Sequence, residues 1–471
     1  MTNFSGENLN AACGGPQGGG MDSRRNGVAE ISPKYLADVA TNGVPVGYKQ
    51  TEVGEIPEDW QVTTVGKVVS ITTGNKNTQD KVVDGLYPFF VRSQQVERIN
   101  TYSFDGEGVL TAGDGVGTGK IFHHIDGKFD FHQRVYLMYN FGDELDGYYF
   151  YIYFSNNFYD RIMSMTAKSS VDSVRREMIA DMLMVMPLKA EQTAIANALS
   201  DVDALISELE KLIAKKQAIK TATMQQLLTG RTRLPQFALH KDGTPKGTKP
   251  SELGEIPEDW VAGYTKELIG KMTSGLSRRL ADNDIGMPVL ISGNIQNYKL
   301  ETDNLKYWYK NDPQGANTDD YVLNDGDILL CFINSLSQIG KPCIFRDIGR
   351  PTIYTTNLFR IVISDNSNSV FAYYLFSTEY FQKNLQTIAK IAVNQASFTK
   401  PDFLNSKIVY PPSKEEQTAI ATILSDMDAD IQALQQRLDK TRQIKQGMMQ
   451  ELLTGKTRLV KPESAALGAV K

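Results

Sequence analysis

Residues 191–234 read EQTAIANALSDVDALISELEKLIAKKQAIKTATMQQLLTGRTRL, and residues 416–459 read EQTAIATILSDMDADIQALQQRLDKTRQIKQGMMQELLTGKTRL. The two stretches share 25 of 44 positions. In both, apolar residues recur in alternating steps of four and three, which is typical of helices that pack along a narrow seam. The seam residues are Ile195, Leu199, Val202, Ile206, Leu209 and Ile213 in the first stretch, and Ile420, Leu424, Met427, Ile431, Leu434 and Leu438 in the second.

Start and stop signals predict one long helix in each stretch. Ser413 and Glu416 fit a capping box, and Gly230 and Gly455 stand where the two helices would end. A helix over residues 191–228 would be roughly 57 Å long. The shared register favours two helices that pack on each other as an antiparallel coiled coil, with one globular block at each end of the rod. The alternative is that each helix lies on a separate domain core.

A second repeat precedes each globular block. Residues 42–60, NGVPVGYKQTEVGEIPEDW, return at 242–260 as DGTPKGTKPSELGEIPEDW, with 12 of 19 positions identical. The blocks that follow, residues 61–190 (the first head) and 261–415 (the second head), differ in length and show little similarity. The chain is therefore interpreted as a duplicated, pseudo-twofold frame that carries two different heads. The predicted segments are a flexible N-terminal stretch 1–41, a domain 42–188, a helix 189–232, a domain with its linker 233–412, a helix 413–459 and a tail 460–471.

Both heads have short β-type runs between Gly, Asn and Asp turns, with helical patterns toward their C-terminal ends, which predicts an α+β fold. The strands expected in the first head are 87–92, 108–110 and 134–139, and the expected helix is 148–163. In the second head we expect strands at 287–291, 327–333, 341–346 and 358–363, and a helix at 370–389.

Polar segments beside glycines in both heads are suited to touching DNA. Asn and Gln can pair with adenine edges, Arg with guanine, and Ser, Thr and Lys can bind phosphates. For any single residue an ordinary solvated loop is the better interpretation, so the prediction concerns the segments as groups. The candidates are Gly74, Asn75, Lys76, Arg92, Ser93, Gln94, Gln95, Lys120, Gln133, Arg134, Lys168 and Ser169 in the first head, and Ser277, Arg278, Arg279, Ser292, Asn294, Gln296, Asn297, Ser335, Ser337, Gln338, Asn394, Gln395 and Ser397 in the second.

Composition and motifs argue against several other classes of protein. The formal net charge is -5, so any DNA-binding surface must be a local patch. The three cysteines and four histidines lack metal-site spacing and predict no metal site, and no apolar run has the roughly 18 residues of a membrane span. These features predict a cytoplasmic location. Residues 113–120, GDGVGTGK, fail as a phosphate loop because Asp114 replaces the first glycine and Ile121 follows Lys120. No catalytic residues are predicted.

The layout resembles the DNA specificity subunit of type I restriction–modification systems. The matching motifs are the helix entries PPSKEEQ at 411–417 and EQTAIA at 416–421, the entries GEIPEDW at 54–60 and 254–260, and PVLISGNIQ at 288–296. PFFVRSQQ at 88–95 matches more loosely. The resemblance covers residues 42–459 and does not extend to 1–41.

The resemblance implies two α/β target-recognition domains that each read one half of a bipartite DNA target, with the helices fixing the gap between the halves. It also implies that two methylation subunits, and restriction subunits after them, dock on this non-catalytic chain. S-adenosylmethionine, ATP and Mg²⁺ would belong to those partners, and this chain would hold no cofactor. The rival interpretation is a coiled-coil scaffold with two protein-binding modules and no DNA contact.

Overall fold

The structure is a computed structural model that describes residues 44–165, 173–393 and 395–460. The chain forms two compact units, one from the described residues of Met1–Ala198 and Met448–Lys471 and one from Leu199–Gly447. The two units are separated within the long helices and not at the predicted segment boundaries, so the division does not test those boundaries, which stay predictions. The predicted flexible stretch 1–41 lies outside the described residues, as do Lys168, Ser169 and Asn394 among the candidates.

The first unit contains most of the first head. Its elements are β1 (Tyr48–Thr51), β2 (Gly54–Pro57), β3 (Gln61–Thr64), α1 (Val65–Val68), β4 (Ser70–Thr73), β5 (Tyr87–Phe90), β6 (Glu97–Ile99), β7 (Phe104–Ala112), β8 (Phe122–Phe131), β9 (Val135–Tyr139), α2 (Gly147–Ser164), α3 (Arg176–Ala180) and β10 (Leu183–Met186). Six strands form one sheet in the order β4-β9-β7-β8-β5-β6, and β3 pairs with β10.

The six-stranded sheet is strongly curved. β8 pairs with β7 so that Phe129 faces Phe104, at the start of β7, whereas β9 begins with Val135 opposite Ala112, at its end. The short connection from Phe131 to Val135 can span only ~14 Å, but the nine residues of β7 extend for roughly 27 Å. The sheet must therefore curl, and its inner face buries an aromatic and aliphatic cluster of Phe90, Leu110, Phe129, Phe131, Val135 and Leu137.

The second unit contains the second head. Its strands are β11 (Thr248–Ser251), β12 (Gly254–Pro257), β13 (Val261–Tyr264), β14 (Ile269–Ser274), β15 (Met287–Leu290), β16 (Ile295–Gln296), β17 (Lys299–Leu300), β18 (Lys306–Trp308), β19 (Ile328–Cys331), β20 (Ile333–Asn334), β21 (Pro342–Ile344), β22 (Ile353–Tyr354), β23 (Leu358–Ile363), β24 (Lys390–Ala392), β25 (Gln395–Ser397) and β26 (Lys407–Tyr410). Its helices are α5 (Ser369–Ser377), α6 (Glu379–Ile388) and α7 (Lys400–Leu404). The main sheets have the orders β14-β23-β19-β21, β18-β15-β22 and β20-β25-β24.

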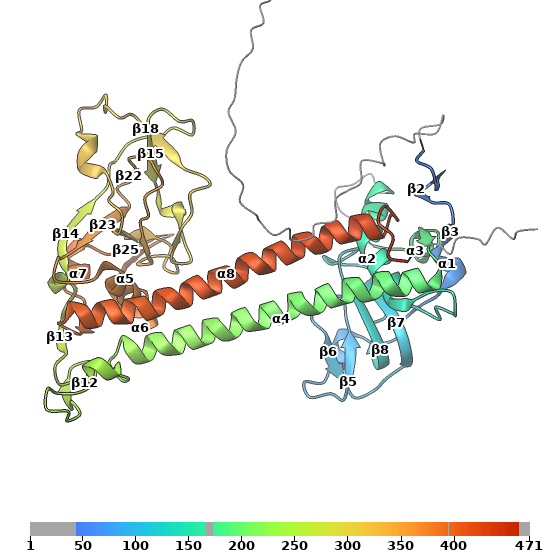
Figure 1. Cartoon of the computed structure of the whole chain (residues 1–471), viewed down its shortest axis with the longest axis horizontal. Coiled ribbons are helices and arrows are strands. Elements are labelled where there is room, and N and C mark those ends of the chain that lie inside the picture. Colours follow the sequence, from blue (N-terminus) through green and yellow to red (C-terminus); the bar gives the residue numbers. More distant parts are fainter. Residues whose placement is uncertain (1–43, 166–172, 394, 461–471) are drawn as a thin grey trace, which may run out of the picture. The chain divides into compact units, whose positions relative to one another are not determined.

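Two helices of 39 residues, α4 (Lys189–Leu227) and α8 (Lys414–Leu452), carry the repeat. Within the second unit they pack side by side (Figure 1) through Leu209, Ile213 and Leu438, with Ile206, Ile431 and Leu434 around them. Flanking ion pairs run in opposite senses along the two helices, because rising numbers on α4 meet falling numbers on α8. The pairs are Asp203–Lys445, Glu210–Arg442, Lys216–Asp430 and Lys220–Asp428.

The predicted seam is therefore continuous only in its middle. Ile420 and Leu424 are buried in the core of the second head, and Met427 packs against the same core. Ile195 and Leu199 are also buried, and Val202 is half-buried. The apolar face of a helix is the same whether a head or another helix covers it, so the sequence period could not separate these two uses.

Two further predictions require correction. The helix expected over 370–389 is interrupted at Thr378, which ends α5 in an extended conformation and caps α6 by accepting a hydrogen bond from the backbone of Phe381. The capping box at α8 is only half formed. Ser413 accepts a hydrogen bond from the backbone of Glu416, but the Glu416 side chain bonds to Arg233 and Trp260 instead of turning back to the cap.

Among the described residues, no helix combines the length and the apolar character that crossing a membrane requires. Mixed helix and strand content, as expected for an α+β protein, holds for both units.

Candidate nucleic-acid interface

In the first head, polar segments from separate strands meet at one edge of the sheet. The turn after β8 donates from His132 N to Phe90 O, at 2.9 Å, and from Gln133 N to Lys76 O, also at 2.9 Å. Gln133 also donates through Nε2 to Asn77 Oδ1, at 2.6 Å. These bonds bring the ends of β4, β5 and β8 together. We define the first rim as residues 74–76, 92–95, 113–120 and 132–134.

Two arginines of the first rim share one carboxylate. Arg92 lies 2.8 Å from Asp114 Oδ1, and Arg134 lies 3.8 Å from Asp114 Oδ2. The side chain of Arg134 is 66% exposed and that of Arg92 is 42% exposed. Burial and the two nearby guanidinium groups act on His132, whose pKa is lowered, mainly by burial. The imidazole is therefore neutral at neutral pH, and the positive charge of the rim comes from arginine and lysine.

The remaining candidates of the first rim are exposed or half-buried. Ser93 Oγ donates to Gln95 O, at 2.8 Å, which closes a local turn and leaves Gln94 and Gln95 exposed. Asn75 and Lys120 are exposed, and Gly74 and Lys76 are partly buried. The first rim therefore exposes amide, guanidinium and ammonium groups.

The second head has an equivalent rim. Thr355 N donates to Leu290 O, at 3.0 Å, and Leu276 forms a parallel bridge to Thr355. Ile333 pairs with Ser397, which places the loop after β20 beside β25. We define the second rim as residues 275–279, 292–297, 332–341, 355–357 and 395–397. Its exposed candidates are Ser277, Arg279, Gln296, Asn297, Ser335, Ser337, Gln338 and Gln395, and Ser292 and Ser397 are half-buried.

Two candidates in the second head have structural roles. Asn294 is 4% exposed, accepts from Ile291 N at 2.9 Å and donates to Glu301 O at 2.9 Å, which removes it from the candidate contacts. Arg278 binds Asp312 through Nε at 2.9 Å, and this hydrogen bond lowers the pKa of Asp312 to about 2. Arg279 forms no ion pair among the described residues and remains the arginine available to a ligand.

A turn in the second head that the sequence did not indicate corresponds to the turn after β8 in the first head. The turn His132–Val135 has its counterpart in Thr355–Leu358, because both close with the fourth residue donating to the first, at 2.9 Å and 3.1 Å. Thr356 and Asn357 therefore occupy the places of Gln133 and Arg134. Lys341 likewise follows the same kind of loop as Lys120. A Gly-Lys pair at 119–120 and 340–341 was the only signal of this in the sequence.

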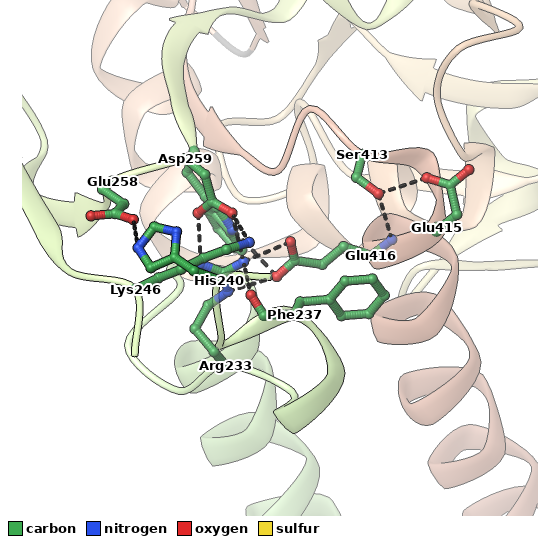
Figure 2. Close-up of polar contacts among 10 residues, drawn as sticks. Arg233, Phe237, His240, Lys246, Glu258, Asp259, Ser413, Glu415 and Glu416 are labelled. Atoms are coloured by element: carbon green, nitrogen blue, oxygen red, sulfur yellow. Dashed lines mark hydrogen bonds and ion pairs between the residues drawn. The ribbon is translucent and has the colours of Figure 1, made fainter. Parts of the chain in front are cut away.

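In the second unit, three segments from the two repeated blocks meet in one cluster around a buried tryptophan. Arg233, after α4, bonds to Glu416 through Nε at 2.7 Å and to Asp259 through Nη1 at 2.7 Å (Figure 2). Trp260 donates from Nε1 to Glu416 Oε1 at 3.4 Å, and the Arg233 guanidinium lies 5.7 Å from the Trp260 ring. Burial would raise the pKa of Asp259, but hydrogen bonds from Arg233 and Lys246 outweigh it and lower the pKa to about 2.

The first unit contains the same cluster from the other copy of each block. Arg458, after α8, bonds to Glu191 through Nε at 2.6 Å and to Asp59 through Nη1 at 2.9 Å. Trp60 donates to Glu191 at 3.0 Å. We call these the anchoring clusters. Each joins the entry to a head, the start of one long helix and the segment that follows the other long helix.

Among the described residues, no group of three or more His, Cys, Asp or Glu side chains is placed to hold a metal ion. Cys331 and Cys343 are free and buried, and burial raises the pKa of the Cys343 thiol to about 12. These thiols therefore pack in the core of the second head.

Comparison with known proteins gives one consistent family. The family model described as the type I restriction modification DNA specificity domain matches residues 57–221 and again residues 270–443, more than half of the chain. The MjaVIII type I restriction enzyme specificity subunit of Methanocaldococcus jannaschii is 27% identical over 438 residues, covering 88% of this chain and 96% of that protein. The putative MjaX specificity subunit of the same organism is 35% identical over 209 residues, which are 44% of this chain and 48% of that protein.

The crystal structure of the S subunit of a type I restriction–modification system from M. genitalium has a similar fold. Its TM-score is 0.57 at 14% identity, over 83% of this chain and 96% of that one. At this identity the likeness concerns the fold alone.

Proposed function

Because the chain belongs to the family of type I restriction–modification DNA specificity subunits, we propose that its two heads read the two halves of one gapped, asymmetric sequence in double-stranded DNA. The supporting observation is that two rims of the same construction carry different side chains. Arg92 of the first rim corresponds in place to Ser292 of the second, since each is the second residue after the paired positions Phe90 and Leu290. Different donors and acceptors at matching places select different bases.

The two long helices set the spacing between the half-sites in this proposal. Support comes from their equal length of 39 residues and from the antiparallel contacts of α4 and α8 within the second unit. Knobs packed along Leu209, Ile213 and Leu438 would make this pair an antiparallel coiled coil. A helix of this length extends over roughly 58 Å, which is between one and two turns of B-DNA.

The chemistry belongs to partner subunits in this proposal. The chain would dock two methylation subunits and, through the assembled enzyme, restriction subunits. S-adenosylmethionine would bind the methylation partners, and ATP with Mg²⁺ the restriction partners. This chain would contribute recognition without catalysis. Substitutions in either rim should therefore reduce recognition step by step, and no single substitution should abolish it as the loss of a catalytic nucleophile would.

The direct test is a map of methylated bases. The chain is expressed with its methylation subunit in a methylation-free host, and modified bases are located by single-molecule sequencing. We expect a two-part, gapped, asymmetric motif that disappears when this chain is omitted. A stable complex that yields no such motif would instead favour a scaffold whose two heads bind proteins.

The helix spacing makes a second prediction. One heptad inserted after Ile213 of α4, with another inserted at the matching level of α8 before Leu434, keeps the seam in register and is expected to lengthen the gap by at most about 3 base pairs. The same methylation map measures the gap. A heptad inserted into α4 alone displaces the partners on α8 and should abolish specific methylation, and an unchanged gap in the doubly extended chain would contradict the spacing role.

A further inference from the structure

The loop from β7 to β8 and the loop from β19 to β21 are built in the same way. Gly113 N donates to Arg134 O at 2.8 Å, and its counterpart Phe332 N donates to Asn357 O at 3.2 Å. The carbonyl groups of Gly113 and Phe332 each accept from the backbone of the residue after a bridged serine, Val174 in one head and Phe398 in the other. The two loops therefore leave their strands at equivalent places, although their sequences differ.

Both loops return through a glycine whose replacement by a larger residue would strain the backbone. Gly119 has φ +70 and Gly340 has φ +78, in the left-handed region that favours glycine. A Cβ on Gly119 would lie 2.3 Å from Ile162 Cδ1 of α2, and a Cβ on Gly340 would lie 2.8 Å from Leu385 Cδ1 of α6. The backbone at the next residue of each loop is thus fixed against the helix of its own head.

That next residue is a lysine in both heads. Lys120 is exposed, and its ammonium lies 5.0 Å from the ring centroid of Tyr159. Lys341 lies 5.8 Å from the ring of Tyr298 and donates to Gln338 Oε1 at 3.0 Å. The aromatic faces hold each positive charge at the end of its rim without neutralising it. No ion pair involves either lysine among the described residues.

We propose that Lys120 and Lys341 bind DNA phosphates and fix the position of each head on the duplex, independently of the base sequence. The inference rests on the proposed function and assigns these two residues a role distinct from base reading. A residue that is the same in both heads cannot account for a difference between half-sites, whereas the neighbouring positions do differ. Gln133 and Arg134 stand where the second head has Thr356 and Asn357. An ammonium on a flexible stem suits phosphate as a point charge.

The test measures how DNA binding of the complex with its methylation subunits depends on salt. Lys120→Met and Lys341→Met keep the apolar stem over the tyrosine and remove the charge. Each is expected to weaken binding to cognate and scrambled duplexes by the same factor, roughly tenfold. The slope of log affinity against log salt concentration should fall by about 0.9 for each lost contact, measured between about 50 and 200 mM salt. The methylated motif should stay the same.

Matched controls are available in both heads. Lys128 lies 4.8 Å from the ring of Tyr102 and Lys266 lies 5.0 Å from that of Tyr264, and both are outside the rims. Lys128→Met and Lys266→Met should leave affinity and slope unchanged, whereas Lys120→Arg should keep the slope of the parent.

Two results would overturn the inference. One is an unchanged slope in Lys120→Met and Lys341→Met, and the other is a loss confined to duplexes with a particular base pair, which would indicate base reading. Failure of the proposed function is distinguishable, because the unsubstituted complex would then bind the gapped site no better than scrambled DNA.

Discussion

Replacing Arg458 with methionine is expected to lower the free energy of unfolding of the first unit by about 3–5 kcal/mol. The guanidinium holds Glu191, whose side chain is 2% exposed, with two hydrogen bonds of 2.6 and 2.7 Å. Without Arg458, the Glu191 carboxylate stays buried and keeps only the indole N–H of Trp60. Asp59 is 33% exposed and can be solvated, so the cost arises mainly from Glu191.

Hydrogen exchange measured by mass spectrometry separates the two units, because peptides of each report its own opening. Arg442→Met, on α8 in the second unit, is the control and is followed through the peptides of that unit. Its pair with Glu210 is about half exposed on both sides and should be worth less than about 1 kcal/mol. Adding Glu191→Gln to Arg458→Met should recover part of the loss. Equal effects of Arg458→Met and Arg442→Met would show that the cluster does not stabilise the unit.

Exchanging residues 61–190 for the first head of another family member is expected to replace one half of the methylated motif completely and to leave the other half and the gap unchanged. The physical reason is that the anchoring cluster of the first unit lies wholly outside the exchanged block. Asp59 and Trp60 precede it, Glu191 follows it, and Arg458 comes from the far end of the chain. The methylation map described above reads the result directly.

The reciprocal exchange, residues 261–415, is the matched experiment. It keeps Arg233, Asp259, Trp260 and Glu416 and should replace the other half of the motif. A change in both halves after either exchange would show that the heads do not read independently, and a change in the gap would show that a head contributes to the spacing.

The repeat made it possible to predict the two long helices and the approximate boundaries of each head. The helix expected at 191–228 is α4 (Lys189–Leu227), because the apolar spacing of four and three residues recurs in both copies of the 44-residue stretch. The resemblance to specificity subunits is confirmed by the family match. β8 was missed, because His123, His124 and Asp126 interrupt its apolar pattern. The sheet pairs this strand through its backbone over eight residues of β7, which a side-chain pattern does not report.

The rims were predicted as a set of polar loops, but not residue by residue. The sequence around Asn294 is as polar as that around the exposed candidates. Only the geometry of the turn directs its amide toward Ile291 and Glu301. No sequence motif identifies Thr356 and Asn357 as part of the second rim, because their position is defined by the pairing of β19 with β23. The first case is decided by the geometry of a local turn and the second by pairing between strands, and a side-chain pattern reports neither.

The two anchoring clusters have a consequence for the gene as well as for the protein. Each cluster takes its tryptophan, its glutamate and its arginine from blocks that occur twice, and these three residues are the same in both copies. A genetic crossover within such a block joins one copy of the block to the other. The cluster residues are the same in both copies, so the joined block still supplies the residue that its cluster needs. A hybrid descendant therefore inherits two complete clusters whichever heads it receives, so recombination of whole heads leaves the anchoring of each head unchanged.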